Sequence, residues 1–169
     1  GCEIGQFREW DYKGEIEWFL LNYEMHGSFQ NFVKNLNFVY LENKELWEND
    51  CNSDGFRWID ADNSDWSIFS YIRYDRLGNF VVIIVNFTPV PRHKYVIGVP
   101  RHTRYKEILN SDDLKYKGSG IINYKDVFSE EIKCHNMPYS LTVDVGPYGA
   151  LILKPEKKNN EFVLEEDKC

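Results

Sequence analysis

The spacing of apolar side chains changes about fifty residues into the chain. From Ser28 onward, apolar residues recur at intervals of three and four, which is the period of one face of an α-helix. The positions are Phe29, Phe32, Val33, Leu36, Val39 and Tyr40. Because Gly27 is a breaker and Ser28 is a good N-cap, we expect a helix over 28–42, with shorter helical stretches at 15–21 and 44–47.

Beyond residue 49, the apolar residues instead form short runs that are separated by turn residues. These runs predict strands at 56–59, 67–74, 79–87, 94–99, 104–109, 140–145 and 150–153. The second and third runs flank Asp75 and Gly78, in a sequence typical of a β-hairpin. Short strands joined by turns in this way predict a mainly-β fold, an antiparallel β-sandwich.

A polar segment separates the helical part from the strands. Residues 49–55 read Asn-Asp-Cys-Asn-Ser-Asp-Gly, a composition typical of turns and linkers. We therefore expect a domain boundary there, between a helical part at 1–48 and a β-sandwich domain at 49–154. The last residues, 155–169, are rich in charge, so we expect a disordered tail.

The net charge limits the classes of partner. The chain has 27 acidic and 20 basic residues and a formal net charge of -7. Proteins that bind polyanions present a basic face, so neither nucleic acid nor an acidic membrane is an expected partner. No apolar stretch reaches the ~18 residues that a membrane span needs.

The first residues and the cysteines suggest a longer parent protein and its cellular location. The sequence opens on Gly-Cys-Glu-Ile, without Met and without the pattern of a signal peptide, so we expect it to begin within a longer protein. Cys2, Cys51, Cys134 and Cys169 are scattered and form no Cys-x-x-Cys pair. Without an export signal, this usage favours free thiols and a cytoplasmic location.

The sequence lacks the usual patterns for metal binding and nucleophilic catalysis. Residues 60–65 resemble a calcium loop, but Asp65 and Tyr71 stand where an EF-hand needs Gly and Glu. The histidines do not converge at metal-ligand spacing, and neither a Gly-x-Ser-x-Gly elbow nor a P-loop is present. We therefore expect no metal and no cofactor. Asn86 begins a glycosylation pattern, which we interpret as coincidence because it ends a strand of core type.

Aromatic residues are unusually frequent, with 5 Trp, 11 Tyr and 11 Phe. Trp18 and Trp47 lie in helical patterns and are expected to pack. Trp10 and Trp58 lie in polar surroundings, one in a loop and one just after the linker. A pyranose ring has an apolar face that Trp can cover, while Glu, Gln or Arg binds the hydroxyls at its edge. For Trp10 and Trp58, sugar binding and packing therefore both stay open.

Six blocks of sequence carry a resemblance to a known family. They lie, in order, at 1–10, 17–21, 55–62, 86–93, 104–112 and 139–142. Together they resemble the bacterial 1,4-alpha-glucan (glycogen) branching enzymes of glycoside hydrolase family 13. The most specific block is Asn-Phe-Thr-Pro-Val-Pro-Arg-His, at 86–93, and it argues against a different family 13 enzyme such as a debranching enzyme. The match is loose at 121–135, and Cys2 stands where many relatives have Gln.

The resemblance implies a part of a larger enzyme. Enzymes of this family carry a catalytic (β/α)8 barrel followed by an antiparallel β domain. This chain would begin after the eighth barrel strand and supply the last barrel helix and the β domain. The family's catalytic acids lie earlier in the barrel, so no catalytic residue is assigned here and the isolated chain is expected to be inactive. The implied reaction cleaves α-1,4 links and forms α-1,6 branches, without metal or cofactor.

The resemblance also implies partners and contacts. The expected partners are the missing barrel and an α-glucan such as glycogen or amylose. The first loop would lie at the active-site face of the barrel, with Glu3, Gln6 and Trp10 as glucan contacts. Trp58 would form a surface glucan site on the sandwich. The alternatives are a free-standing carbohydrate-binding β-sandwich and a purely structural domain.

Overall fold

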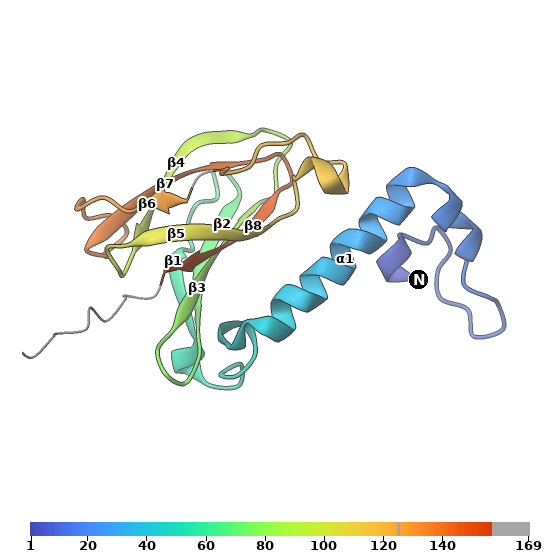
Figure 1. Ribbon diagram of the computed structural model, residues 1–169, viewed down its shortest axis with the longest axis horizontal. Coiled ribbons are helices and arrows are strands. Elements are labelled where there is room, and N and C mark those ends of the chain that lie inside the picture. Colours follow the sequence, from blue (N-terminus) through green and yellow to red (C-terminus); the bar gives the residue numbers. More distant parts are fainter. Residues whose placement is uncertain (125, 157–169) are drawn as a thin grey trace, which may run out of the picture.

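The computed structural model describes residues 1–124 and 126–156. In these residues one long helix precedes eight strands (Figure 1), which confirms the predicted mainly-β fold. The elements are α1 (Glu24–Glu42), β1 (Phe56–Asp60), β2 (Ile68–Tyr74), β3 (Phe80–Asn86), β4 (Arg92–Val99), β5 (Arg104–Asn110), β6 (Val127–Phe128), β7 (Tyr139–Val145) and β8 (Ala150–Pro155). None of the described helices is long and apolar enough to cross a membrane.

The strands form two antiparallel sheets. A six-stranded sheet has the order β1-β2-β3-β8-β5-β6, and β4 pairs with β7 in a second sheet. The predicted hairpin between β2 and β3 is present. Its turn is stabilised by Asp75, whose Oδ1 accepts hydrogen bonds from the backbone N–H groups of Leu77 at 2.9 Å and Asn79 at 2.8 Å. Gly78 takes the positive φ, 78°, that this turn requires.

The main core lies between the two sheets. Alternate residues of each strand point inward, as the period of a strand requires. The large buried members include Ile68, Ile72, Val82, Ile84, Ile97, Tyr105, Leu141, Leu151 and Leu153. Strand β3 is buried on its other face as well, so its side chains are apolar almost throughout.

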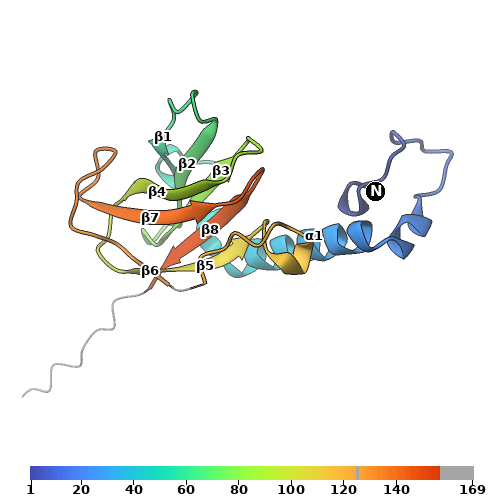
Figure 2. The same ribbon diagram turned by 90° about the horizontal axis from the view of Figure 1, so that it is seen from above.

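Helix α1 covers that outer face of the six-stranded sheet. Phe32, Leu36 and Val39 of the helix pack against a second buried cluster that contains Val81 and Ile83. Figure 2 shows that the C-terminal part of α1 lies along the sheet, while its N-terminal part and residues 1–22 project beyond the strands. The N-terminal loop and β1 therefore lie far apart in the molecule.

The structure corrects the predicted bounds of the helical elements. Helix α1 begins at Glu24, after the extended residue Tyr23, and not at Ser28. Gly27 lies within its first turns and donates its backbone N–H to the Tyr23 carbonyl at 3.1 Å, because one glycine costs a helix only ~1 kcal/mol. The helical stretch predicted at 15–21 is a 3-10 turn, η2 (Trp18–Asn22).

Strand β6 was not predicted from the sequence. Strand β6 contributes two residues, whose pairs with Arg104 and Tyr105 of β5 are long-range. Two residues are too few to show an alternating pattern, so nothing local marked them as a strand.

Side-chain hydrogen bonds organise the predicted linker, and the predicted tail begins later than expected. Asn49 is buried and donates to Asp54 at 3.2 Å, and the Asn52 side chain donates to Asn49 at 2.7 Å. Pro155 pairs with β5, and the Glu156 backbone N–H donates to a β5 carbonyl at 2.8 Å, so the tail does not begin at residue 155. The rest of the predicted tail, 157–169, lies outside the described residues. The division into domains at residue 49 stays a prediction.

Candidate functional site

Two of the predicted sugar contacts, Gln6 and Trp10, lie on one loop. The loop follows the short helix η1 (Cys2–Ile4) and ends at η2, at the end of α1 that projects from the sheets (Figure 1). His26 of α1 holds η1 in place, since its Nδ1 lies 2.7 Å from the Ile4 carbonyl oxygen. The loop is therefore attached to the helix and not to the β domain.

A buried carboxylate closes the base of this loop. Glu17 is 8% exposed, and its Oε2 accepts the backbone N–H groups of Phe7 at 3.2 Å and Arg8 at 3.4 Å. Its Oε1 pairs with Nε of Arg8 at 3.1 Å. Three donors compensate the loss of hydration of one carboxylate, which then joins the two ends of the loop. Sequence reasoning missed Glu17, because its partners are mainly backbone groups that carry no side-chain signal.

Gln6 is engaged within the loop. Its amide oxygen accepts the Glu17 backbone N–H at 3.1 Å, and its amide nitrogen donates to the Arg8 carbonyl at 3.3 Å. Its position supports the loop, and a direct contact with sugar stays a prediction.

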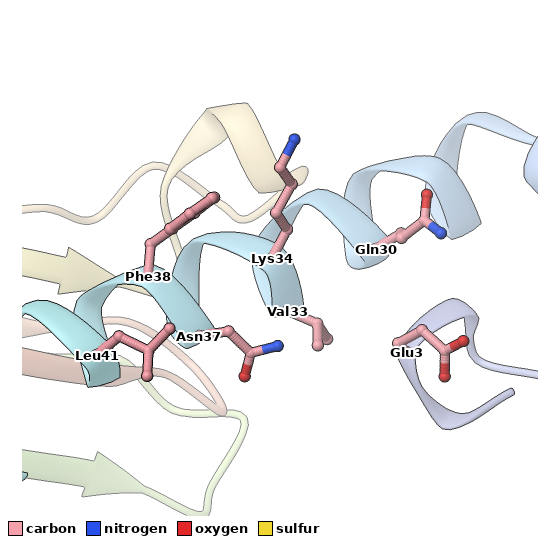
Figure 3. Close-up of a pocket in the computed structure, with 7 residues that line it drawn as sticks. All are labelled: Glu3, Gln30, Val33, Lys34, Asn37, Phe38 and Leu41. Carbon is pink, nitrogen blue, oxygen red and sulfur yellow. The ribbon is translucent and has the colours of Figure 1, made fainter. Parts of the chain in front are cut away.

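Glu3 lies apart from Trp10. It occupies η1 and lines a separate hollow of about 260 Å³ with residues of α1. Figure 3 shows Glu3 opposite the part of the helix that carries Gln30 and Val33. A hydrogen bond from its own backbone N–H lowers the pKa of the Glu3 carboxyl. The structure does not bring Glu3 and Trp10 into one site.

Trp10 stands in solvent beside a second aromatic residue. Trp10 is 83% exposed and Tyr12 is 75% exposed, and their ring centroids lie 6.4 Å apart with the planes tilted by 39°. The two rings border a hollow of about 410 Å³. The other lining side chains are mostly polar and include Gln6, Arg8, Glu9, Asp11 and Glu15. Ring faces flanked by carboxylates are a chemistry suited to a sugar.

Trp58 belongs to a different aromatic group, on the outer face of the six-stranded sheet. Its ring centroid lies 4.9 Å from that of Phe56 and 6.0 Å from that of Phe69, and Phe87 follows at 5.4 Å from Phe69. We call these four residues the Trp58 strip. Each of them is between 37% and 59% exposed, beyond the part of the face that α1 covers. Trp58 therefore both packs and leaves part of its ring accessible.

The most specific sequence block has a structural role. Asn86 is 1% exposed, and its amide nitrogen donates to the carbonyls of Val90 and Gly146, both at 2.9 Å. Its amide oxygen accepts the backbone N–H of Thr88 at 3.0 Å and the Thr88 hydroxyl at 2.8 Å. One buried amide thus fixes the turn after β3, and it is inaccessible to a glycosylating enzyme.

The calcium-like loop is organised by its own side chains. Asp60 accepts the Asp62 backbone N–H at 3.3 Å and the Asn63 amide at 3.0 Å, as in a turn. No three His, Cys, Asp or Glu residues within 1–124 and 126–156 are placed to hold a metal ion. Cys2, Cys51 and Cys134 carry free thiols, and Cys169 lies outside the described residues.

Comparison with known proteins identifies the β domain and its relatives. The family described as "Alpha amylase, C-terminal all-beta domain" matches residues 58–156. The 1,4-alpha-glucan branching enzyme GlgB of Pseudomonas putida is 43% identical over 92% of this chain and 21% of its own length. GlgB 1 of Clostridium perfringens (strain SM101) is 42% identical over 99% of this chain and 26% of its own length.

The structural comparison finds a more distant protein. The crystal structure of an alpha-amylase from H. orenii covers 76% of this chain and 20% of its own, with a TM-score of 0.44 and 16% sequence identity. The chain spans only about a quarter or less of the length of the curated relatives described above. The resemblance to branching enzymes is confirmed, and the chain belongs to the alpha amylase C-terminal all-beta domain family, in the form shared with 1,4-alpha-glucan branching enzymes.

Proposed function

We propose that this chain is the C-terminal region of a cytoplasmic 1,4-alpha-glucan branching enzyme that acts on glycogen or amylose. The observation that carries the proposal is the identity of 42% and 43% to branching enzymes over nearly the whole chain. The reaction cleaves an α-1,4 link through a covalent glucosyl intermediate and transfers the segment to a 6-hydroxyl group. The free thiols of Cys2 and Cys51 agree with a reducing compartment.

The catalytic acids belong to the part of the enzyme that this chain does not span. A retaining transfer needs two carboxyl groups about 5 Å apart, held across a cleft. The described residues form one long helix and two antiparallel sheets, without the repeated strand–helix units of a (β/α)8 barrel. Within the whole enzyme, this chain therefore supports the barrel and contacts glucan. In isolation, it does not catalyse branching.

Helix α1 supports the view that the β domain has a large partner. No residue of its 19 is buried, although the helix packs on the sheet. Its exposed apolar residues include Met25 at 63%, Phe38 at 52% and Leu41 at 67%. Each such side chain gains ~1.5–3 kcal/mol when it is fully buried, so a covering surface would stabilise the helix strongly. A free-standing carbohydrate-binding sandwich would not account for this apolar helix.

The glucan contacts follow from exposure and position. Trp10 presents a nearly free ring beside polar side chains, and Trp58 presents part of its ring on the Trp58 strip. We place Trp10 near the catalytic cleft, because the loops after barrel strands form the active-site face. Glu3 and Gln6 serve as polar neighbours of that region, and Trp58 holds a glucan chain at a second point on the surface.

A chimera tests the proposal. The segment of the Pseudomonas putida enzyme that matches this chain is replaced by this chain, and branching of amylose is measured by the loss of iodine colour and by counting new α-1,6 links. We expect the chimera to branch amylose. The matched controls are the same enzyme without the segment and the isolated 169-residue chain, both expected to be inactive. A chimera that is insoluble, or soluble and inactive, would contradict the proposal.

A further inference from the structure

We propose that Tyr12 and Trp10 together form a two-ring platform that binds two neighbouring glucosyl units of an α-1,4-linked chain. Only the role of the platform in branching rests on the proposed function. The binding of glucan to the platform can be measured with this chain alone. Tyr12 belongs to none of the blocks that carry the resemblance to branching enzymes, and it is not among the residues predicted to contact sugar.

Both rings of the platform are largely exposed to solvent and are therefore accessible to a ligand. Both rings are among the most exposed large side chains of the chain, at 83% for Trp10 and 75% for Tyr12. Exposing two large rings side by side in water costs free energy unless a ligand covers them. The two ring centroids lie 6.4 Å apart, and the Lys13 ammonium lies over one face of Tyr12, 5.4 Å from its centroid. The exposed fractions show that most of both rings still faces solvent.

The tilt between the rings favours one type of glucan. Consecutive glucose rings of an α-1,4-linked chain are turned relative to each other, so the chain curves. A β-1,4-linked chain is a flat ribbon and would require coplanar rings. The planes of Trp10 and Tyr12 differ by 39°, which suits the curved chain.

The loop is organised before any ligand binds. Asp11 lies between Trp10 and Tyr12 in the sequence. Its carboxylate accepts the Lys13 backbone N–H at 2.9 Å, and its backbone carbonyl accepts the Gly14 backbone N–H at 3.1 Å. Glu17 closes the base of the loop through two backbone groups and Arg8. Pre-organisation of this kind lowers the entropy cost of binding.

Hydroxyl-binding groups surround the platform. Glu9 and Glu15 line the hollow of about 410 Å³ together with the two rings, and Arg8 adds donors. Carboxylates accept hydrogen bonds from sugar hydroxyls, and a guanidinium donates to them. The hollow therefore combines two aromatic rings with several side chains that can bind sugar hydroxyls.

The test measures binding of maltoheptaose to the full chain by isothermal titration calorimetry. All variants carry Trp58→Ala, so that the Trp58 strip does not contribute to binding. We expect Trp10→Ala and Tyr12→Ala each to raise the Kd about fivefold, the loss of one stacking contact. Tyr12→Phe should keep the affinity, because stacking needs the ring and not the hydroxyl.

The controls separate the platform from the proposed function. Tyr124→Ala removes a ring that is 79% exposed on another loop, and it should leave the Kd unchanged. Cellohexaose should bind at least tenfold more weakly than maltoheptaose. The platform is overturned if Tyr12→Ala behaves like Tyr124→Ala, if cellohexaose binds as tightly, or if no maltoheptaose binds. An inactive chimera with intact Tyr12-dependent binding would instead overturn the branching-enzyme proposal alone.

Discussion

Lys154 on the last strand and Glu45 just after helix α1 form an ion pair at 2.9 Å. The side chain of Glu45 is 6% exposed and that of Lys154 is 30% exposed. The same ammonium group donates to the Asn43 side chain at 2.7 Å. One lysine therefore fixes the end of the helix to the sheet, and this contact adds to the apolar packing that joins the two into one unit.

Lys154→Met should destabilise this unit. The change leaves Glu45 buried without its partner, and removing one member of a fully buried pair costs ~3–5 kcal/mol. Because Lys154 is partly exposed, we expect about 2–3 kcal/mol of unfolding free energy to be lost, measured by urea unfolding. The matched control is Lys44→Met, which breaks the exposed pair of Lys44 with Glu48 and should cost less than ~1 kcal/mol. Equal effects of the two changes would rule out the role of Lys154.

Glu17→Gln should loosen the loop that carries Trp10 and leave the β core intact. The amide that replaces the carboxylate loses the ion pair with Arg8 and weakens the acceptors of two backbone N–H groups. We expect trypsin to cleave after Arg8 and Lys13 several times faster, with an unchanged urea midpoint for the sheets. Glu15→Gln, an exposed change in the same loop, serves as the control. Equal cleavage of both variants would show that Glu17 does not hold the loop.

Asn86→Ala should be costly for so small a change. It removes four hydrogen bonds of a side chain that is 1% exposed, and leaves the Val90 and Gly146 carbonyls without that donor. An unsatisfied buried polar group costs ~1–3 kcal/mol, so we expect a loss of about 3 kcal/mol in unfolding free energy. Asn31→Ala, on the exposed side of α1, should change it by less than ~0.5 kcal/mol. A loss at Asn86 no larger than that at Asn31 would contradict this role of the amide.

Asp75 should make the stability of the β2–β3 hairpin sensitive to acid. Burial alone would raise the pKa of its carboxyl, but hydrogen bonds from Asn79 and Leu77 outweigh it, and the pKa lies below its ordinary value near 3.8. A lowered pKa means that the ionised form stabilises the fold above the ordinary value, and that this stability is lost as the pH falls through the folded pKa. We expect urea midpoints to drop between pH 5 and pH 2, and to drop less in Asp75→Asn. If the urea midpoints of the unchanged chain and of Asp75→Asn fell equally with pH, Asp75 would not be the source of the acid sensitivity.

Leu41→Ser should act only when the proposed barrel is present. The side chain is 67% exposed, so the isolated chain should lose less than ~0.5 kcal/mol. In the chimera with the Pseudomonas putida enzyme, the same change should lower the melting temperature by several degrees, because a buried apolar contact is lost. Leu77→Ser, in a hairpin turn where the side chain is 87% exposed, should affect neither protein. An unchanged chimera with Leu41→Ser would exclude this face of α1 as the barrel contact.

Elements with a local pattern could be predicted well. The alternating apolar runs located seven of the strands within one to two residues, and the spacing of Phe32, Leu36 and Val39 located helix α1. Its start was placed four residues late, because Gly27 followed by Ser28 looks like the start of a helix, whereas α1 contains both residues. The two-residue strand β6 carried no pattern at all.

The candidate site could be predicted only in part. Trp10 and Trp58 stood out as aromatic residues in polar surroundings, and both are exposed in the structure. Trp18 was expected to pack because it lies in a helical pattern, but it is 52% exposed. Glu17 and Lys154 act through backbone groups and residues that are distant in sequence, so nothing in their neighbourhood marked them. Glu3 and Gln6 were grouped with Trp10 because the resemblance places the whole first loop at the active-site face. The fold turns Glu3 toward α1 and engages Gln6 within the loop.

The sequence by itself determined the family and the order of the elements, because these depend on residue type and on spacing along the chain. The tertiary structure alone decided which face of the sheet α1 covers, where the N-terminal loop lies relative to Trp58, and which carboxylates are buried. Those outcomes depend on contacts between residues far apart in the chain, and their free energy is set by burial and by partners that no local pattern encodes.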